Sequence, residues 1–303
     1  MTETKKELQE SLDKKTVPWE GKITNIQAQI LESLAKYKYL TIPHLLMLDI
    51  GTNQYKYMWK QISSLRDRRK PLVVCNNYDV PEPRKGRVFS MYHLSKEGKK
   101  ALVQELDYPI EEIRMPPNKR SVAYRLYPHR VQQLNYQILL DKWAEKNDLE
   151  IPMFDTDFDY QGNNRAGKNL KAVTRIDLTN DRYIIADGAY KIRDQNGKET
   201  FHLLEVEMGD KTAKAIQKIH RHAEAMTFRC THKKYGLDES KSYTVAFLFE
   251  YESLKNLVIE RAKNDEALSL VKKYFICKSM ETIQQDDFFT SWQTLGGADV
   301  NFY

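Results

Sequence analysis

Three acidic residues stand in two apolar runs of the chain that flank an Asn-Gly turn. Asp187 follows the run Ile-Ile-Ala, and Glu205 and Glu207 alternate with apolar residues in Leu-Leu-Glu-Val-Glu-Met. Two apolar runs around such a turn are typical of an antiparallel β-hairpin. Because side chains alternate faces along a strand, we expect Glu205 and Glu207 to share one face.

The register of this hairpin decides whether the three carboxylates meet. If Asp194 and Lys198 flank a three-residue loop, Asp187 lies opposite Glu205. A two-residue loop at Asn196-Gly197 shifts the register by one residue and separates the acids. The sequence leaves both loops open, so the proposed chemistry depends on which of them forms.

Carboxylates that converge within an apolar sheet repel each other unless protons or a cation compensate. Mg²⁺ and Mn²⁺ prefer hard oxygen ligands, and a bound ion activates water and stabilises negative charge on phosphorus. Asp187, Glu205 and Glu207 are therefore candidate metal ligands and catalytic residues for cleaving a phosphodiester. The alternative is that they are ordinary solvated acids on an edge strand.

The C-terminal part of the chain predicts an α/β (α+β) architecture, a mixed sheet flanked by helices. Helices are expected over 129–146, 211–234 and 252–264, and strands over 151–160, 182–193, 200–208, 242–250 and 274–277.

The N-terminal part shows the element order of a winged helix-turn-helix. Helices are expected over 24–38, 42–48, 53–67 and 96–106, and strands over 72–75 and 87–94. In such a domain the third helix enters the major groove of DNA, and basic residues neutralise phosphates. The candidate DNA-binding residues are Lys56, Lys60, Arg66, Arg68 and Arg69 on the third helix and Arg84, Lys85 and Arg87 in the hairpin loop. The alternative is a winged helix that binds a protein.

Charge and composition support a chain with two functions. Residues 1–128 carry 23 Lys and Arg against 15 Asp and Glu, and residues 129–303 carry 25 against 27. With 41% hydrophobic residues the chain can form a packed core, which argues against disorder as its main state. The predicted organisation is a flexible arm (1–20), a DNA-binding domain (21–108), a proline-containing linker (109–127) and a catalytic domain (128–303).

Other features place the protein in the cytoplasm. No run of apolar residues approaches the length of a membrane-spanning helix, so no membrane insertion is expected. The charged N-terminal segment lacks the apolar region of a secretory signal. Three cysteines are too few and too scattered for a disulfide framework.

The order of these motifs resembles a known family. Asp187 followed by Glu205-Val206-Glu207 on a hairpin resembles the PD-(D/E)XK nuclease fold of restriction endonucleases. With a winged helix and the helix start His129–Asn135 before it, the chain resembles the replication-relaxation family, which includes MobC-type plasmid mobilisation relaxases. The resemblance spans roughly residues 22 to 250.

The resemblance implies an enzyme that nicks one strand of double-stranded DNA at a plasmid or mobile-element origin of transfer or replication. It implies that the three acids bind Mg²⁺ or Mn²⁺, and that a coupling protein or accessory mobilisation proteins are partners. The competing hypotheses are a non-catalytic DNA-binding regulator of replication or transcription that keeps a nuclease-like scaffold, and an adaptor that binds mobilisation proteins.

Glu207 departs from the pattern, because the family usually has Lys at that position. Lys211 or Lys214, at the start of the next helix, are the candidates to supply the missing positive charge. His129 and Asn135 match the family's helix pattern, although a helix start and a core hydrogen bond are the plainer interpretation. We interpret His220 and His222 as exposed or phosphate-facing residues.

Overall fold

The computed structural model describes residues 22–78, 88–116, 122–162, 170–209, 211–283, 288 and 290–302. The expected arm, residues 1–20, lies outside them. The chain divides into two compact units between Tyr127 and Pro128. Among the described residues, no helix is both long enough and apolar enough to cross a bilayer.

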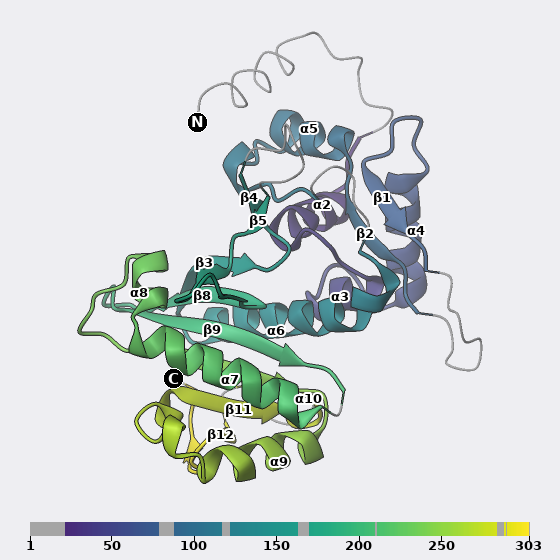
Figure 1. Ribbon diagram of the computed structural model, residues 1–303. Helices are drawn as coiled ribbons and strands as arrows, with labels where there is room; N and C mark the ends of the chain where they lie inside the picture. The colour runs from purple at the N-terminus through teal and green to yellow at the C-terminus, as the bar shows by residue number, and fades with distance from the viewer. Residues whose placement is uncertain are drawn as a thin grey trace. The chain divides into compact units, whose positions relative to one another are not determined.

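The N-terminal unit is a helical unit closed by a short hairpin (Figure 1). Its elements are α2 (Asn25–Tyr37), α3 (Ile42–Met47), α4 (Tyr55–Arg66), β1 (Val73–Asn76), β2 (Met91–Leu94) and α5 (Lys96–Glu105). Strands β1 and β2 pair antiparallel, and a single bridge joins Leu40 to Tyr92. Their order along the chain is the one that the sequence predicts.

Hydroxyl side chains cap the starts of α2, α3 and α5, whereas α4 begins after Gln54 without a side-chain cap. Thr24 and Thr41 each accept the backbone N–H three residues later, and Ser95 accepts the N–H of Gly98. Such caps satisfy backbone donors that the first helical turn leaves unpaired. Helix α4 is held by apolar packing, since its residues Met58 and Ile62 are completely buried. One face of α4 is therefore fixed in the core while the other remains exposed.

The segment predicted as a linker contains structure of its own. Two short 3-10 helices occur in it, η2 (Ile110–Glu112) and η4 (Tyr124–Leu126). Ile113 is buried, and the backbone N–H of Arg114 donates to the carbonyl of Ala35 on α2 at 3.0 Å. This part of the chain thus packs on the N-terminal unit.

The C-terminal unit is built on a seven-stranded mixed sheet, which confirms the predicted mixed α/β class at this level. The strand order is β13-β12-β11-β10-β9-β8-β3; β9, β10 and β11 are parallel, and the remaining neighbours are antiparallel. The sheet strands are β3 (Glu150–Thr156), β8 (Gly188–Arg193), β9 (Glu199–Glu207), β10 (Thr244–Phe249), β11 (Phe275–Ser279), β12 (Trp292–Thr294) and β13 (Asp299–Val300). Two small hairpins pair β4 (Tyr160–Gln161) with β5 (Lys171–Ala172) and β6 (Arg175–Asp177) with β7 (Tyr183–Ile185).

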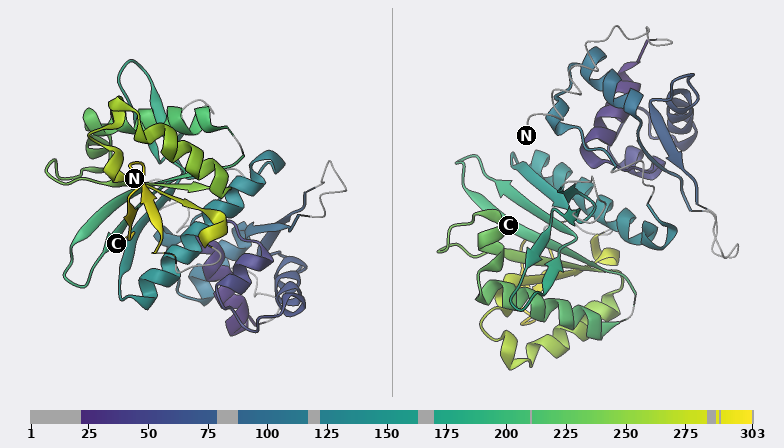
Figure 2. Two further views of the ribbon diagram at one scale, coloured as in Figure 1. Left: turned by 90° about the horizontal axis from the view of Figure 1, so that it is seen from below. Right: turned by 45° about the horizontal axis from the view of Figure 1, so that its top comes forward.

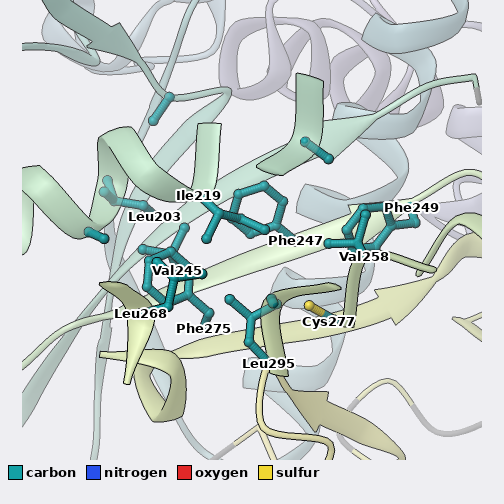
Figure 3. Close-up of a cluster of buried hydrophobic side chains, with 14 of the residues drawn as sticks. Leu203, Ile219, Val245, Phe247, Phe249, Val258, Leu268, Phe275, Cys277 and Leu295 are labelled. Atoms are coloured by element: carbon teal, nitrogen blue, oxygen red, sulfur yellow. The ribbon is translucent and has the colours of Figure 1, made fainter. Parts of the chain in front are cut away.

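Helices cover both faces of this sheet (Figures 1 and 2). The helices of the unit are α6 (Tyr127–Lys146), α7 (Thr212–Thr227), α8 (Cys230–Tyr235), α9 (Glu252–Lys263) and α10 (Met280–Ile283). On one face, α7 and α9 pack against residues such as Leu203, Val245 and Phe247 (Figure 3). On the other face, α6 packs through Tyr136 and Leu140. Strand β9 is therefore buried on both sides.

The structure differs from the sequence-based elements at several places. The expected strand 182–193 is interrupted at Ala186-Asp187, because β7 pairs with β6 whereas β8 pairs with β9 and β3. The expected helix 211–234 is two helices, since Arg229 adopts a left-handed conformation (φ 54°) between them. Strands β12 and β13 were not predicted, because two or three residues give no periodic signal.

Candidate active site

The hairpin between β8 and β9 forms the three-residue loop. The backbone N–H of Asp194 donates to the carbonyl of Lys198 at 3.0 Å, and the Asp194 carboxylate accepts the N–H groups of Asn196 and Lys198 at 2.9 Å. Gly197 takes a positive φ of 76°, which only glycine adopts readily. Gly188 therefore pairs with Leu204, and Asp187 comes beside Glu205.

The three predicted acids meet around the ammonium group of Lys218 on α7. Lys218 Nζ lies 2.8 Å from Glu205 Oε2, 2.6 Å from Glu207 Oε1 and 4.0 Å from Asp187 Oδ2. All three acidic residues are buried. The carboxylates that the sequence singled out thus share one cationic centre, but this cation belongs to the protein itself.

Asp187 is held in place by two further hydrogen bonds. Its Oδ2 accepts the backbone N–H of Val206 at 2.7 Å and lies 3.1 Å from Nε2 of His129 on α6. Burial raises the pKa of Asp187, but the charges of His129 and Lys218 outweigh burial and lower this pKa to about 2. The same ion pair raises the pKa of His129 against the opposing effect of burial. Asp187 is therefore a carboxylate at neutral pH.

The two glutamates differ in their surroundings. Glu205 Oε1 accepts a hydrogen bond of 2.7 Å from His222 Nε2, so both of its oxygens have a partner on α7. Burial raises the pKa of Glu207 above its usual range, and Lys218 offsets this rise only in part. A second positive charge near Glu207 would therefore lower its pKa further and favour its ionised form.

A fourth acid that the sequence analysis missed lies beside Asp187. Asp157 follows β3 and accepts hydrogen bonds of 3.0 Å from Arg130 and from Gln133 on α6. Gln133 also donates to the main-chain carbonyl of Asp187 at 3.3 Å. Burial raises the pKa of Asp157, although Arg130 opposes this rise. The alternation of acids in Asp155-Thr156-Asp157 was the available signal in the sequence.

The positive charge comes one turn later on α7 than predicted. Lys211 and Lys214 are exposed at the start of the helix, whereas Lys218 reaches the acids. The interpretation of His222 as exposed is wrong, because this side chain is completely buried against Glu205. A signal existed: Lys218 and His222 lie one turn apart, beside the apolar residues Ala215 and Ile219 of the same stripe.

The remaining accessory candidates separate into two cases. His129 joins the site through Asp187. Asn135 donates instead to Gln132 Oε1 at 3.0 Å, one turn earlier on α6, which agrees with its plainer interpretation as a structural hydrogen-bonding residue.

Comparisons of the chain with protein-family models, curated proteins and solved structures found no match.

The donors fit a hard divalent cation, because Asp187, Glu205 and Glu207 offer carboxylate oxygens, which Mg²⁺ and Mn²⁺ prefer. Within the described part of the chain, no group of three or more His, Cys, Asp or Glu is already arranged to hold a metal ion. The acids are arranged around Lys218 Nζ instead. An ion at this site would therefore either add its positive charge to that of Lys218 or displace the Lys218 ammonium from the carboxylates.

The predicted DNA-binding residues of α4 fall into two groups. Lys56 and Lys60 on the helix, and Arg69 just after it, are exposed. Arg66 is held by the Asp67 carboxylate through two hydrogen bonds of 2.6 and 2.9 Å, and Arg68 donates to Gln27. The loop candidates Arg84, Lys85 and Arg87 lie outside the described residues.

Proposed function

We propose that the chain is a metal-dependent DNA endonuclease that nicks one strand at a plasmid or mobile-element origin, as a relaxase does. The observation that carries the proposal is the convergence of Asp187, Glu205 and Glu207, from the ends of two adjacent strands, on one cationic centre. Buried acids arranged in this way have a high cost unless positive charge is supplied. In a nuclease, a metal ion bound by the acids would supply this positive charge and would also stabilise negative charge on the phosphodiester during cleavage.

In this proposal the three acids hold Mg²⁺ or Mn²⁺, which supplies water activation and stabilises negative charge on phosphorus. Lys218 adds a fixed ammonium at the same place and takes the role assigned to Lys211 or Lys214 from the sequence. His129 orients the Asp187 carboxylate and favours its ionised form. Glu205 is oriented by His222.

The N-terminal unit serves in the same proposal as a winged helix that docks on double-stranded DNA, and the C-terminal unit as a PD-(D/E)XK domain. The order of helices and hairpin supports the first assignment. Lys56 and Lys60, exposed on α4, are placed to neutralise backbone phosphates. A coupling protein and accessory mobilisation proteins are the partners that such a relaxase uses.

A specific observation favours a second candidate, a DNA-binding regulator that retains the nuclease scaffold without activity. Lys218 lies 2.8 Å from Glu205 and 2.6 Å from Glu207, so the protein itself already supplies part of the positive charge that an ion would bring. In this case the carboxylate cluster is a buried ion-pair network whose role is structural.

Nicking of supercoiled plasmid distinguishes the two candidates. The plasmid carries the DNA that flanks the gene on both sides, and the protein is incubated with it in Mn²⁺ or in chelator. The relaxase predicts open circles only with Mn²⁺, and loss of nicking in Asp187→Asn. Asp177→Asn is the matched control, because Asp177 is an exposed acid paired with Arg175 in the same unit. Wild type that binds the plasmid but never nicks it supports the regulator.

A further inference from the structure

The N-terminal unit exposes a group of large aromatic side chains at one place. Tyr55 and Trp59 lie one turn apart on α4 and are 45% and 47% exposed, and Phe89 before β2 is 47% exposed. The rings of Tyr55 and Phe89 lie 5.8 Å apart. Exposed aromatic rings that gather in this way mark an interaction surface more often than an isolated one does.

These rings line an open groove of about 420 Å³ between α4 and the strand that follows the hairpin loop. Buried Tyr92 forms part of its base. This volume falls within the range, about 300–1,000 Å³, in which protein pockets accept small planar groups.

The charge around the groove is positive. Lys56 lines it, and Lys60 follows one turn later on the exposed face of α4. None of the described residues that line the groove is acidic. Aromatic faces with adjacent lysines complement a ligand that combines flat apolar rings with negative charge.

We propose that this aromatic–lysine groove, lined by Tyr55, Lys56, Trp59 and Phe89 with Lys60 one turn beyond Lys56 on α4, binds unpaired bases of single-stranded DNA. Bases stack on the aromatic rings, and the two lysines contact the phosphates that join them. Stacking on aromatic side chains combined with a basic rim is the mechanism by which proteins hold single strands.

An unpaired strand fits this groove better than an intact duplex does. In a duplex the faces of the bases are already stacked on each other, and a groove-binding helix meets only their edges and the thymine methyl. Three exposed rings would then gain little contact. A melted strand presents the base faces themselves, which is the state that a strand-nicking enzyme needs near its target. The inference rests on the DNA-binding part of the proposed function and specifies its substrate as locally unpaired DNA.

Binding of two labelled DNAs to the full chain tests the inference. One is an oligothymidine of about 12 nucleotides, and the other is a duplex of the same length, both followed by fluorescence anisotropy. Trp59→Ala is expected to weaken binding of the oligothymidine by about 5- to 150-fold, the range for losing one stacked base. Binding of the duplex should change by less than about threefold. Trp59→Phe, which keeps a ring, should retain most of the single-strand affinity.

Two further variants test the contribution of charge and control for the loss of any exposed aromatic ring. Lys56→Ala should reduce the slope of log affinity against log salt for the oligothymidine by about 0.7, the value for one phosphate of a single strand. Phe228→Ala, which removes a 54% exposed aromatic of the other unit, is the matched control and should leave both affinities unchanged.

Three outcomes would overturn the inference. The first is that Trp59→Ala and Tyr55→Ala bind the oligothymidine as well as wild type does. The second is that both variants lose single-strand and duplex binding equally, which would assign the rings to duplex docking and leave only the proposed function standing. The third is that they keep all DNA binding but lose a mobilisation protein from the complex, which would assign the groove to a protein partner. If wild type binds no DNA at all, the proposed function fails together with the inference.

Discussion

His222 Nε2 lies 2.7 Å from Glu205 Oε1, and both side chains are completely buried. This hydrogen bond joins α7 to strand β9, which carries two of the three acids of the site. Together with Lys218 one turn earlier on α7, it fixes both oxygens of Glu205. The helix thus positions the carboxylate as well as covering it.

Replacing His222 by Leu is expected to destabilise the C-terminal unit by about 1–3 kcal/mol, because a buried carboxylate oxygen loses its donor. Urea unfolding measures this change. His220→Leu is the control: it removes a histidine two residues earlier whose side chain is 42% exposed and pairs with Asp265. Its cost should stay below about 1 kcal/mol. Equal costs for the two variants would contradict the positioning role of His222.

Replacing Lys218 by Met removes the ammonium that three carboxylates share. Breaking a fully buried ion pair costs about 3–5 kcal/mol, and since 34% of the Lys218 side chain is exposed, we expect about 2–3 kcal/mol at neutral pH. Lys214→Met, on the exposed side of the same helix, is the control and should be nearly neutral.

The same Lys218→Met variant reports on the cation. If the acids accept Mn²⁺, millimolar Mn²⁺ should raise the melting temperature of Lys218→Met more than that of wild type, because the ion replaces the lost charge. An equal response of the two proteins, with Lys214→Met as reference, would argue that Mn²⁺ does not bind at these acids.

Two acids of the site should affect stability in opposite directions. The pKa of Asp187 is lowered to about 2 in the folded chain, so its contribution is present above its ordinary pKa of 3.8 and is lost as the pH falls towards 2. Asp187→Asn should therefore cost about 2 kcal/mol at neutral pH, and the difference from wild type should close between about pH 4 and pH 2.

Glu207 behaves in the reverse way. Its pKa is raised in the folded chain, so ionising it costs stability as the pH rises above its ordinary value of 4.5. Glu207→Gln should be more stable than wild type at neutral pH and equal to it in more acidic solution. Chemical unfolding at a series of pH values measures both variants, and a Glu207→Gln protein that is less stable than wild type at neutral pH would refute this account of the site.

Gly98 is required by the contact between α5 and β1. A Cβ atom at this position would lie 2.1 Å from the backbone oxygen of Leu72, which cannot move aside as a flexible side chain can. Gly98→Ala should destabilise the N-terminal unit by about 1–3 kcal/mol. Thermal unfolding measures this change. Gly296→Ala is the control and should have little effect, because its Cβ would lie 3.5 Å from the nearest atom.

The sequence predicts the hairpin and its acids but leaves the register open. Periodicity identifies β8 and β9, because apolar residues and the Asn-Gly turn are local features. The choice between a two- and a three-residue loop depends on the side-chain hydrogen bonds of Asp194 and on the left-handed Gly197, which a pattern of apolar residues does not specify. The structure selects the three-residue loop.

The partners of the acids were harder to predict because they come from other elements. Lys218 and His222 lie on α7, and His129 and Gln133 lie on α6, which covers the opposite face of the sheet. Their contacts depend on how these helices pack on the strands, which one sequence does not reveal. Polar residues beside the apolar stripe of α7 were the available signal. The break at Ala186-Asp187, which ends β7 before β8 begins, likewise depends on pairing with β6.

We propose that Asp187, Glu205 and Glu207 together hold one divalent cation. The most direct measurement is the number of Mn²⁺ ions bound per chain, obtained from the loss of the free Mn²⁺ paramagnetic resonance signal on titration with the DNA-free protein. The account predicts one ion per wild-type chain, none in Asp187→Asn, and one in the control Asp177→Asn. Wild type that binds no Mn²⁺, or Asp187→Asn that binds it as tightly as wild type, would contradict the claim.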